Sequence, residues 1–576
     1  MIVKNRRVTF LIGGEAGDGI FASGNILSKT FMHGGLHVFS TNEYISIIRG
    51  GHQWYSITVS ESPVFSNRYK IDLLIALNRE VPIIHIDRLE KKTSFIIIDE
   101  RDKSERIVGF NIISLPMYDI LKKRNAKKVM RNSIALGALV GLVKYDISIL
   151  ERVYMNTYSE DIAEKNISLA KMGYNYVLEK YSHYLKKIFF SSNISRSQRI
   201  FCTGNEAIAI GALASGLKFY AAYPMTPASS ILHFLARLQK DLNIVVIQPE
   251  SELAAINMII GAAFAGVRSM TATSGGGFSL MTEALGFAAM AEIPVVIVVV
   301  QRPGPSTGMP TYTSQGDLRF VLHASQGEFP RIVLAPGDPY EAFEIAYYSF
   351  NLAWKYQLPV IILSDKFLAE SGWSCDKFIP SFPIEEGKII RDVYNGREKY
   401  KRYKITEDGV SPFAIPGIQN AIVKANSNEH DEEGSPTYDP ALVNSMVDKR
   451  FKKQELLKRE MLRYKTIKYY GDEYPEKIIV SWGSLKGPIL EAINILGKNK
   501  KIGFLQVIWM EPFPRDLVKN ILSKVRENDI MIIENNRTGL LNSLLNEYLH
   551  LDVKKKFLKY DGRPPYPYEI IKFLEG

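Results

Sequence analysis

Between Cys202 and Asp317 the chain contains five short motifs: GNEA (Gly204–Ala207), YPMTP (Tyr223–Pro227), QPESE (Gln248–Glu252), TSGGG (Thr273–Gly277) and GPSTG (Gly304–Gly308). Apolar runs typical of strands, such as Asn243–Ile247 and Ile293–Val300, lie between them, and each run ends where a motif begins. An open parallel α/β sheet presents its ligand-binding loops in this way, at the carboxyl ends of its strands. The stretch therefore predicts a doubly wound, ligand-binding α/β domain.

These motifs resemble those of the 2-oxoacid:ferredoxin oxidoreductases, in particular the fused γ–α subunit of the two-subunit, archaeal-type enzymes. Tyr223–Pro227 follows the family signature Tyr-Pro-Ile-Thr-Pro, with Met225 in place of the isoleucine. Ala272–Met281 and Gln301–Gly308 also follow the family closely. The resemblance extends over nearly the whole chain, from Gly13 onward.

The length of 576 residues predicts several domains. Strand-like and helical patterns alternate along most of the chain, so the expected fold class is α/β with several doubly wound parallel sheets. With names taken from the resemblance, we expect a γ domain at 1–190 and a pyrimidine-binding thiamine diphosphate domain at 198–385. A linker with a crossing helix at 386–475 and a transketolase carboxyl-terminal-like domain at 476–576 follow. A polar segment, 191–197, separates the first two domains.

A glycine-rich segment lies near the start of the first domain. A predicted strand, Val8–Ile12, runs into the loop Gly13–Gly19, and a helix starts near Ile20. Such a loop is either a plain structural turn or an anion site at a helix amino terminus. The glycine spacing does not fit G-x-G-x-x-G, which opposes an alternative hypothesis of a nicotinamide-dependent dehydrogenase. The resemblance instead links this domain to coenzyme A.

Composition limits the compartment and the cofactors. The two cysteines, Cys202 and Cys375, cannot supply the four thiolates of an iron–sulfur cluster, and they suit a reducing cytoplasm. Neither a signal peptide nor a membrane-spanning run is expected. The net charge of +11 includes basic runs at Lys122–Arg131 and Lys449–Arg463, which predict a solvated surface or, alternatively, steering of an acidic ferredoxin. Without a recognition motif, nucleic acid is not an expected partner.

Glu252 is the first candidate for catalysis. It follows a predicted strand that ends near Gln248 and precedes the helical run Leu253–Ala265. A carboxylate at a helix start can simply interact with the helix dipole. The resemblance implies more, because a glutamate at this place in thiamine diphosphate enzymes bonds the aminopyrimidine ring and activates the cofactor. Glu250, two residues earlier, is the alternative.

The remaining candidates surround this glutamate in the family pattern. Thr226, fixed between Pro224 and Pro227, fits a cap for a helix over Ser229–Lys240. The resemblance places it beside the cofactor and the substrate, and one turn can serve both roles. The resemblance also implies cofactor contacts from Tyr223, Pro224, Gly275 and Gly276. The glycines alone would indicate a phosphate loop, but the resemblance assigns them to the pyrimidine side.

One position departs from the family. Relatives carry an arginine that binds the substrate carboxylate where this chain has Tyr312. Thr226, Tyr312 and Arg302 are the expected substrate-binding residues, and Tyr312→Arg is expected to lower KM by about 5–30-fold. Because a tyrosine donates one neutral hydrogen bond and arginine donates charged pairs, the departure also supports an alternative function: a catalytically degenerate, regulatory subunit.

The resemblance implies the reaction and the assembly. The expected reaction is coenzyme A-dependent oxidative decarboxylation of a 2-oxoacid (pyruvate, 2-oxobutyrate or 2-oxoglutarate), with electrons passed to ferredoxin. A β subunit is expected to hold the diphosphate, Mg²⁺ and a [4Fe–4S] cluster, in a heterodimer or an (αβ)₂ assembly. No metal-binding Gly-Asp-Gly motif occurs here in a fitting context, so no metal site is expected in this chain.

Overall fold

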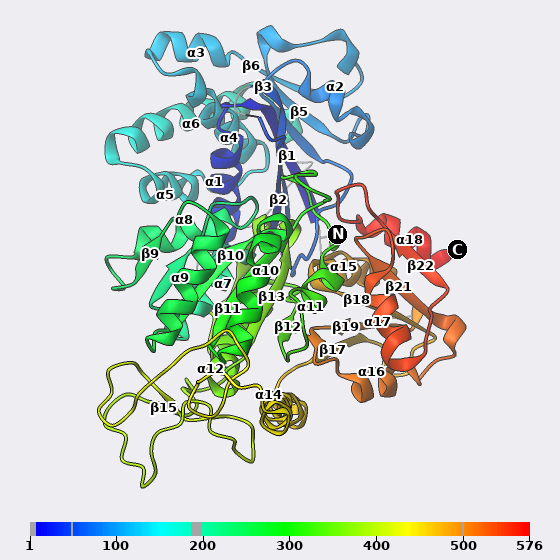
Figure 1. Cartoon of the computed structure of the whole chain (residues 1–576). Coiled ribbons are helices and arrows are strands. Elements are labelled where there is room, and N and C mark those ends of the chain that lie inside the picture. Colours follow the sequence, from blue (N-terminus) through cyan, green and yellow to red (C-terminus); the bar gives the residue numbers. More distant parts are fainter. Residues whose placement is uncertain (1–6, 48–49, 186–197, 498–499) are drawn as a thin grey trace. The chain divides into compact units, whose positions relative to one another are not determined.

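The computed structural model describes residues 7–47, 50–185, 198–497 and 500–576, so the predicted linker 191–197 lies outside the described residues. The chain divides into two compact units (Figure 1). The first comprises Met1–Cys202, Ser371–Lys377 and Tyr566–Gly576, and the second comprises Thr203–Glu370 and Phe378–Pro565. Both units are α/β, as predicted.

The first unit contains an eight-stranded sheet with the order β6-β5-β4-β1-β3-β2-β14-β7. Its strands are β1 (Arg7–Ala16), β2 (His37–Glu43), β3 (Gly50–Ser60), β4 (Leu73–Ala76), β5 (Phe95–Asp99), β6 (Asn111–Leu115), β7 (Ile200–Thr203) and β14 (Gly372–Cys375). The half from β1 to β6 is parallel, whereas β3 runs antiparallel to β1 and β2, and β14 runs antiparallel to β2. The sheet is therefore mixed in strand direction.

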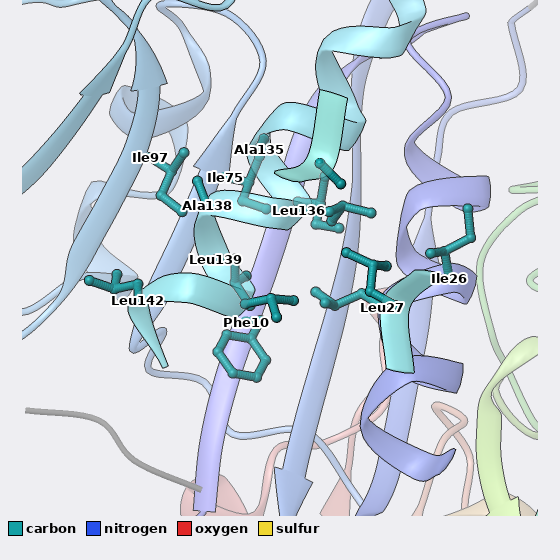
Figure 2. Packing of buried hydrophobic residues seen from close by; sticks show 14 of the residues in the cluster. Phe10, Ile26, Leu27, Ile75, Ile97, Ala135, Leu136, Ala138, Leu139 and Leu142 are labelled. Carbon is teal, nitrogen blue, oxygen red and sulfur yellow. The ribbon is translucent and has the colours of Figure 1, made fainter. Parts of the chain in front are cut away.

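Helices cover this sheet and form its core. They are α1 (Ile20–His33), α2 (Val81–Ile84), α3 (Met117–Arg124), α4 (Arg131–Leu142), α5 (Ile147–Thr157) and α6 (Glu160–Lys180). The helix α18 (Pro567–Glu575) belongs to the same unit. Every residue of α4 is buried. Figure 2 shows Leu136 and Leu139 of α4 near Phe10 of β1 and Leu27 of α1, and all four belong to one hydrophobic cluster. A helix that is apolar on all sides is stable only when it is enclosed in this way.

The glycine-rich segment differs from the predicted loop. β1 continues through Gly13 and Gly14 to Ala16, because these residues pair with β3. The turn is confined to residues 17–19, where Gly19 has a φ of 74° and caps α1. The buried Arg131 fixes the turn through an ion pair with Asp18 of 2.7 Å. Helix α1 begins at Ile20, as predicted.

The second unit contains a seven-stranded sheet with the order β20-β12-β13-β11-β10-β8-β9. Its strands are β8 (Phe219–Ala221), β9 (Val245–Ile247), β10 (Ser269–Thr273), β11 (Val295–Gln301), β12 (Ile332–Leu334), β13 (Pro359–Asp365) and β20 (Trp509–Glu511). All pairs are parallel except β12 with β20. The helices around it are α7 (Gly204–Ala214), α8 (Ser229–Leu238), α9 (Glu252–Phe264), α10 (Gly275–Met290), α11 (Leu318–His323), α12 (Pro339–Tyr356) and α13 (Lys366–Glu370).

A smaller five-stranded sheet belongs to the same unit, with the order β17-β19-β18-β21-β22. Its elements are β17 (Ile467–Gly471), β18 (Lys477–Trp482), α15 (Lys486–Leu496), β19 (Ile502–Val507), α16 (Arg515–Leu522), β21 (Ile530–Glu534), α17 (Leu540–Leu549) and β22 (Lys555–Leu558). One hydrophobic cluster includes Leu363 of the larger sheet and Trp482 of the smaller one. The buried Glu341 of α12 adds a polar link, because Lys486 of α15 donates to it at 2.5 Å.

The charged segment around Lys449 corrects the prediction of a solvated surface. It lies in α14 (Pro440–Glu460), which follows the short pair β15 (Ile389–Ile390) and β16 (Phe413–Ala414). Lys449 and Lys453 are 1% and 0% exposed, and both form ion pairs with the buried Glu292, at 2.5 Å for Lys449. Burial opposes ionisation of Glu292, but the two lysines outweigh it and hold the pKa of its carboxyl well below its usual value.

None of the described helices is long and apolar enough to cross a membrane.

Candidate active site

Glu252 lies in the first turn of α9, just beyond the end of β9. The helix is capped by Ser251, whose hydroxyl accepts a hydrogen bond from the backbone N–H of Ala254 at 3.2 Å. Because Ser251 does the capping, the Glu252 side chain is available for another role. Glu252 is only 3% exposed, whereas the alternative, Glu250, is exposed.

The Glu252 carboxylate is buried without a partner for one of its oxygens. Glu252 Oε1 makes no hydrogen bond among the described residues, and neither does the buried Thr273 Oγ1. Both oxygens face Gly277: a Cβ at this glycine would lie 2.7 Å from Glu252 Oε1 and would collide with Thr273 Oγ1. A buried carboxylate oxygen without a donor is costly, so the arrangement fits a ligand that donates a hydrogen bond to Glu252.

The three glycines form the first turn of α10. They do not form the loop that the sequence alone would indicate. Ser274 is the N-cap and makes no side-chain capping bond. Gly277 is buried against Glu252, whereas Gly276 is exposed and has open space beside it. The glycines therefore let α10 approach Glu252 closely and keep side chains out of the space before its amino terminus.

The Tyr223–Pro227 motif forms the turn between β8 and α8. The predicted capping role of Thr226 is wrong, because the N-cap of α8 is Ala228 and no side chain caps this helix. The backbone carbonyl of Thr226 instead accepts a hydrogen bond from Arg302 Nη1 at 2.7 Å. Tyr223 is exposed, and Pro224 and Thr226 are half-buried.

A pocket of about 470 Å³ brings several predicted residues together. Its lining comprises Met225, Gly275, Gly276, Ser279, Arg302, Gly304, Pro305, Ser306, Thr307, Asp317 and Phe320. Among the described residues, Arg302 and Asp317 supply its only ionisable side chains. Burial lowers the pKa of Arg302, and burial raises the pKa of Asp317 to about 6, in each case against the attraction of the other group. The pocket thus combines a cation for an anionic ligand with a carboxyl group that titrates near neutral pH.

Tyr312 does not belong to this lining. Its ring lies under the guanidinium of Arg563, 5.1 Å from the ring centroid, and its backbone N–H donates to the Met309 carbonyl. The next residue, Thr313, donates its N–H to the Gly562 carbonyl at 2.9 Å. The segment 309–313 is therefore docked on residues 562–563, and the substrate-binding role of Tyr312 stays a prediction.

Comparison with known proteins identifies the family. A 2-oxoacid:ferredoxin oxidoreductase subunit alpha from a Sulfolobus species is 35% identical over 97% of this chain and 95% of the relative. The chain belongs to the 2-oxoacid:ferredoxin oxidoreductase alpha subunits. A subunit alpha from Saccharolobus solfataricus is 33% identical over 97% of this chain and 96% of the relative.

Family matches cover both units. Residues 9–176 match the family described as pyruvate ferredoxin/flavodoxin oxidoreductase, and residues 210–449 match its thiamine diphosphate-binding region. The solved 2-oxoglutarate:ferredoxin oxidoreductase of Magnetococcus marinus, with 2-oxoglutarate, coenzyme A and succinyl-CoA bound, matches with a TM-score of 0.89 and 30% identity, over 99% of both chains. Glu252 and the pocket lie within the thiamine diphosphate-binding region of this oxidoreductase subunit.

Sequence reasoning missed Asp317 and Thr273. Asp317 directly precedes α11, where an aspartate normally indicates a helix cap, yet its side chain makes no capping bond. Thr273 belongs to a strand, where threonine is common. The packing of Gly275 against Asp317 and of Gly277 against Thr273 indicates their place in the site, and Asp317 also lines the pocket.

Proposed function

We propose that this chain is the alpha subunit of an enzyme that oxidatively decarboxylates 2-oxoacids with coenzyme A. The substrates would be pyruvate, 2-oxobutyrate or 2-oxoglutarate, the products acyl-coenzyme A and carbon dioxide, and the electron acceptor ferredoxin. The unpaired, buried Glu252 Oε1 beside Gly277 carries this proposal, because it needs a hydrogen-bond donor that no described residue supplies.

The residues around Glu252 fit thiamine diphosphate. Glu252 would accept a hydrogen bond from the aminopyrimidine ring, while Tyr223, Pro224, Thr226, Gly275 and Gly276 would form the rest of its binding surface. When bound, this cofactor supplies the carbanion chemistry that decarboxylation requires. Gly277 keeps the Glu252 carboxylate accessible from α10, and the burial of Glu252 excludes water from it.

Arg302 would hold the substrate carboxylate. It lines the pocket, and its hydrogen bond to the Thr226 carbonyl orients the guanidinium while leaving other N–H groups for a ligand. Because Arg302 supplies this cation, Tyr312 in place of the family arginine does not leave the pocket without one. The departure at Tyr312 supports the degenerate-subunit alternative, whereas the cation of Arg302 in the pocket opposes it.

The first unit would bind coenzyme A. A cavity of about 620 Å³ lies beside Gly19, Ala22 and Ser23 of the glycine turn and α1. Its rim carries the exposed Arg124, Lys127 and Lys165, which offer cations to phosphate groups. Replacement of Lys127 by alanine should raise the KM for coenzyme A and leave the KM for the 2-oxoacid unchanged.

A β subunit would complete the enzyme, in a heterodimer or an (αβ)₂ assembly in the cytoplasm. It would carry the diphosphate site, Mg²⁺ and the [4Fe–4S] cluster. The chain's two cysteines, Cys202 and Cys375, lie 3.7 Å apart (Sγ–Sγ) in the first unit and form no disulfide. They contact each other and are not arranged as ligands around an iron–sulfur cluster.

The test is to compare the purified chain alone with the chain co-expressed with its β subunit. Iron content and 2-oxoacid-dependent dye reduction are measured for both. We expect iron and activity only in the complex. Activity from the chain alone would contradict the shared site, and an inactive complex with full iron and thiamine diphosphate content would contradict the proposed reaction.

A further inference from the structure

Asp317 supplies the one carboxyl group in the described lining of the 470 Å³ pocket, and the proposed reaction assigns no role to it. Asp317 is held in place from two sides. Its backbone N–H donates to Gln301 Oε1 at 2.9 Å, which fixes the start of α11 against the end of β11. Its side chain lies directly over Gly275: a Cβ at this glycine would lie 2.9 Å from Asp317 Oδ1 and closer still to Oδ2.

The surroundings of Asp317 leave its carboxyl group directed at the pocket. It makes no capping bond to α11, and no ion pair with Arg302 forms within the described part of the chain. The first turn of α10, which packs against it, carries only glycines. The next cation on its own helix, Arg319, is directed away, to Ser543 and Glu547. Arg302 is thus the charged group, among the residues that the structure describes, that acts on Asp317.

A carboxylate and a bound 2-oxoacid in one pocket would repel each other, because both are anions. A protonated carboxyl group removes this repulsion and can donate a hydrogen bond to an oxygen of the ligand. Resting on the proposed function, we propose that Asp317 is a substrate-binding residue that takes up a proton when a 2-oxoacid binds and donates it as a hydrogen bond to the ligand's oxygen, beside Arg302. No bond to carbon forms or breaks in this step, and the proton comes from solvent.

Ligand affinity should decrease as the pH rises. Burial raises the pKa of Asp317 to about 6, so the group is mostly ionised at pH 7 before the ligand arrives. An anionic ligand disfavours the carboxylate further and raises this pKa again. Between the two pKa values ligand affinity should fall by up to about tenfold per pH unit as the pH rises, and binding at pH 7 should be accompanied by net proton uptake.

The experiment is calorimetry on the assembled complex with oxamate and N-oxalylglycine, isosteres of pyruvate and 2-oxoglutarate that cannot be decarboxylated. Titration in buffers of different ionisation enthalpy gives the number of protons taken up. We expect uptake in the wild-type complex and in Asp516→Asn, an exposed aspartate of α16, and none in Asp317→Asn. The Asp317→Asn complex should bind the ligand with an affinity that does not change between pH 6 and 8.

A second variant tests the same idea with the carboxyl group kept. Gly275→Ala displaces the Asp317 carboxylate, so its proton uptake should differ from that of the wild type. Ligand binding without proton uptake in the wild-type complex, or undiminished uptake in Asp317→Asn, would overturn this inference while 2-oxoacid turnover still supports the proposed function. Failure of the wild-type complex both to bind either ligand and to turn over any 2-oxoacid would instead overturn the proposed function.

Discussion

Gly277 lies so close to Glu252 that a Cβ at the glycine would stand 2.7 Å from the carboxylate Oε1. The two residues are the meeting point of α9 and α10, the helices that follow two parallel strands of one sheet. A backbone without a side chain at 277 is what allows a buried glutamate to keep an unpaired oxygen.

Gly277→Ala should disable the site without unfolding the chain. The added methyl group must displace Glu252 or Thr273, and overpacking of this kind costs about 1–3 kcal/mol. We expect loss of thiamine diphosphate binding, measured by fluorescence quenching or calorimetry. Gly261→Ala is the matched control, because Gly261 on α9 is exposed and has nothing within 4 Å of a Cβ. Equal thiamine diphosphate affinities in the two variants would contradict the assigned geometry.

Glu292→Gln should destabilise the second unit. The substitution leaves Lys449 and Lys453 buried without their anion, and breaking a buried ion pair in this way costs about 3–5 kcal/mol. Chemical denaturation monitored by tryptophan fluorescence measures the loss. Glu283→Gln is the control, because Glu283 is an exposed residue of the neighbouring helix α10. If both variants unfolded at the wild-type midpoint, the buried ion pairs would contribute nothing to stability.

The same carboxyl group should make stability depend on pH on the acid side. Its pKa is lower in the folded chain than its ordinary value of 4.5, so the folded state binds fewer protons there than the unfolded state. Its stabilising contribution is present above about pH 4.5 and is lost as the pH falls towards the folded pKa. The unfolding midpoint of the wild type should therefore decrease below pH 4.5 more steeply than that of Glu292→Gln. Parallel pH profiles would contradict this origin.

For Tyr312→Arg, the sequence and the structure predict opposite changes in KM. The family pattern predicts a lower KM, whereas the position of the Tyr312 ring under Arg563 predicts that a second guanidinium would be repelled. From this contact we expect a KM for pyruvate and 2-oxoglutarate that is unchanged or higher. Tyr312→Phe, which keeps the ring, should behave as the wild type. A fall in KM of about 5–30-fold in Tyr312→Arg would restore Tyr312 to the carboxylate site.

Local pattern predicted most of the parallel strands of the second unit. The predicted runs Asn243–Ile247 and Ile293–Val300 contain β9 (Val245–Ile247) and most of β11 (Val295–Gln301), because short apolar runs between loop motifs have few other ways to be buried. The pattern could not place β14, in which Gly372 and Trp373 pair with β2 more than 300 residues away in the sequence. It also could not reveal that Gly13 and Gly14 pair with β3, since glycine is disfavoured in strands.

The buried polar residues show more clearly what the sequence cannot predict. Lys449 and Lys453 were expected in solvent because lysine is almost never buried unless it is paired, and the partner, Glu292, precedes them by more than 150 residues. Nothing in the sequence around Asp317 indicates a binding role, because an aspartate directly before a helix is normally a cap. Glu252, in contrast, is predicted from the sequence, because the family motif implies a glutamate at this place that bonds the cofactor.

The most direct measurement of the central claim is 2-oxoacid-dependent ferredoxin reduction by complexes that carry Glu252→Gln or Glu250→Gln. Glu252→Gln keeps the size of the side chain and removes its charge, so the complex should assemble normally and lose about 10²–10⁴-fold in turnover. Glu250→Gln, at an exposed position two residues away, should retain wild-type turnover. Near-normal turnover in Glu252→Gln, or a comparable loss in Glu250→Gln, would contradict the assignment of Glu252 as the carboxylate that activates the cofactor.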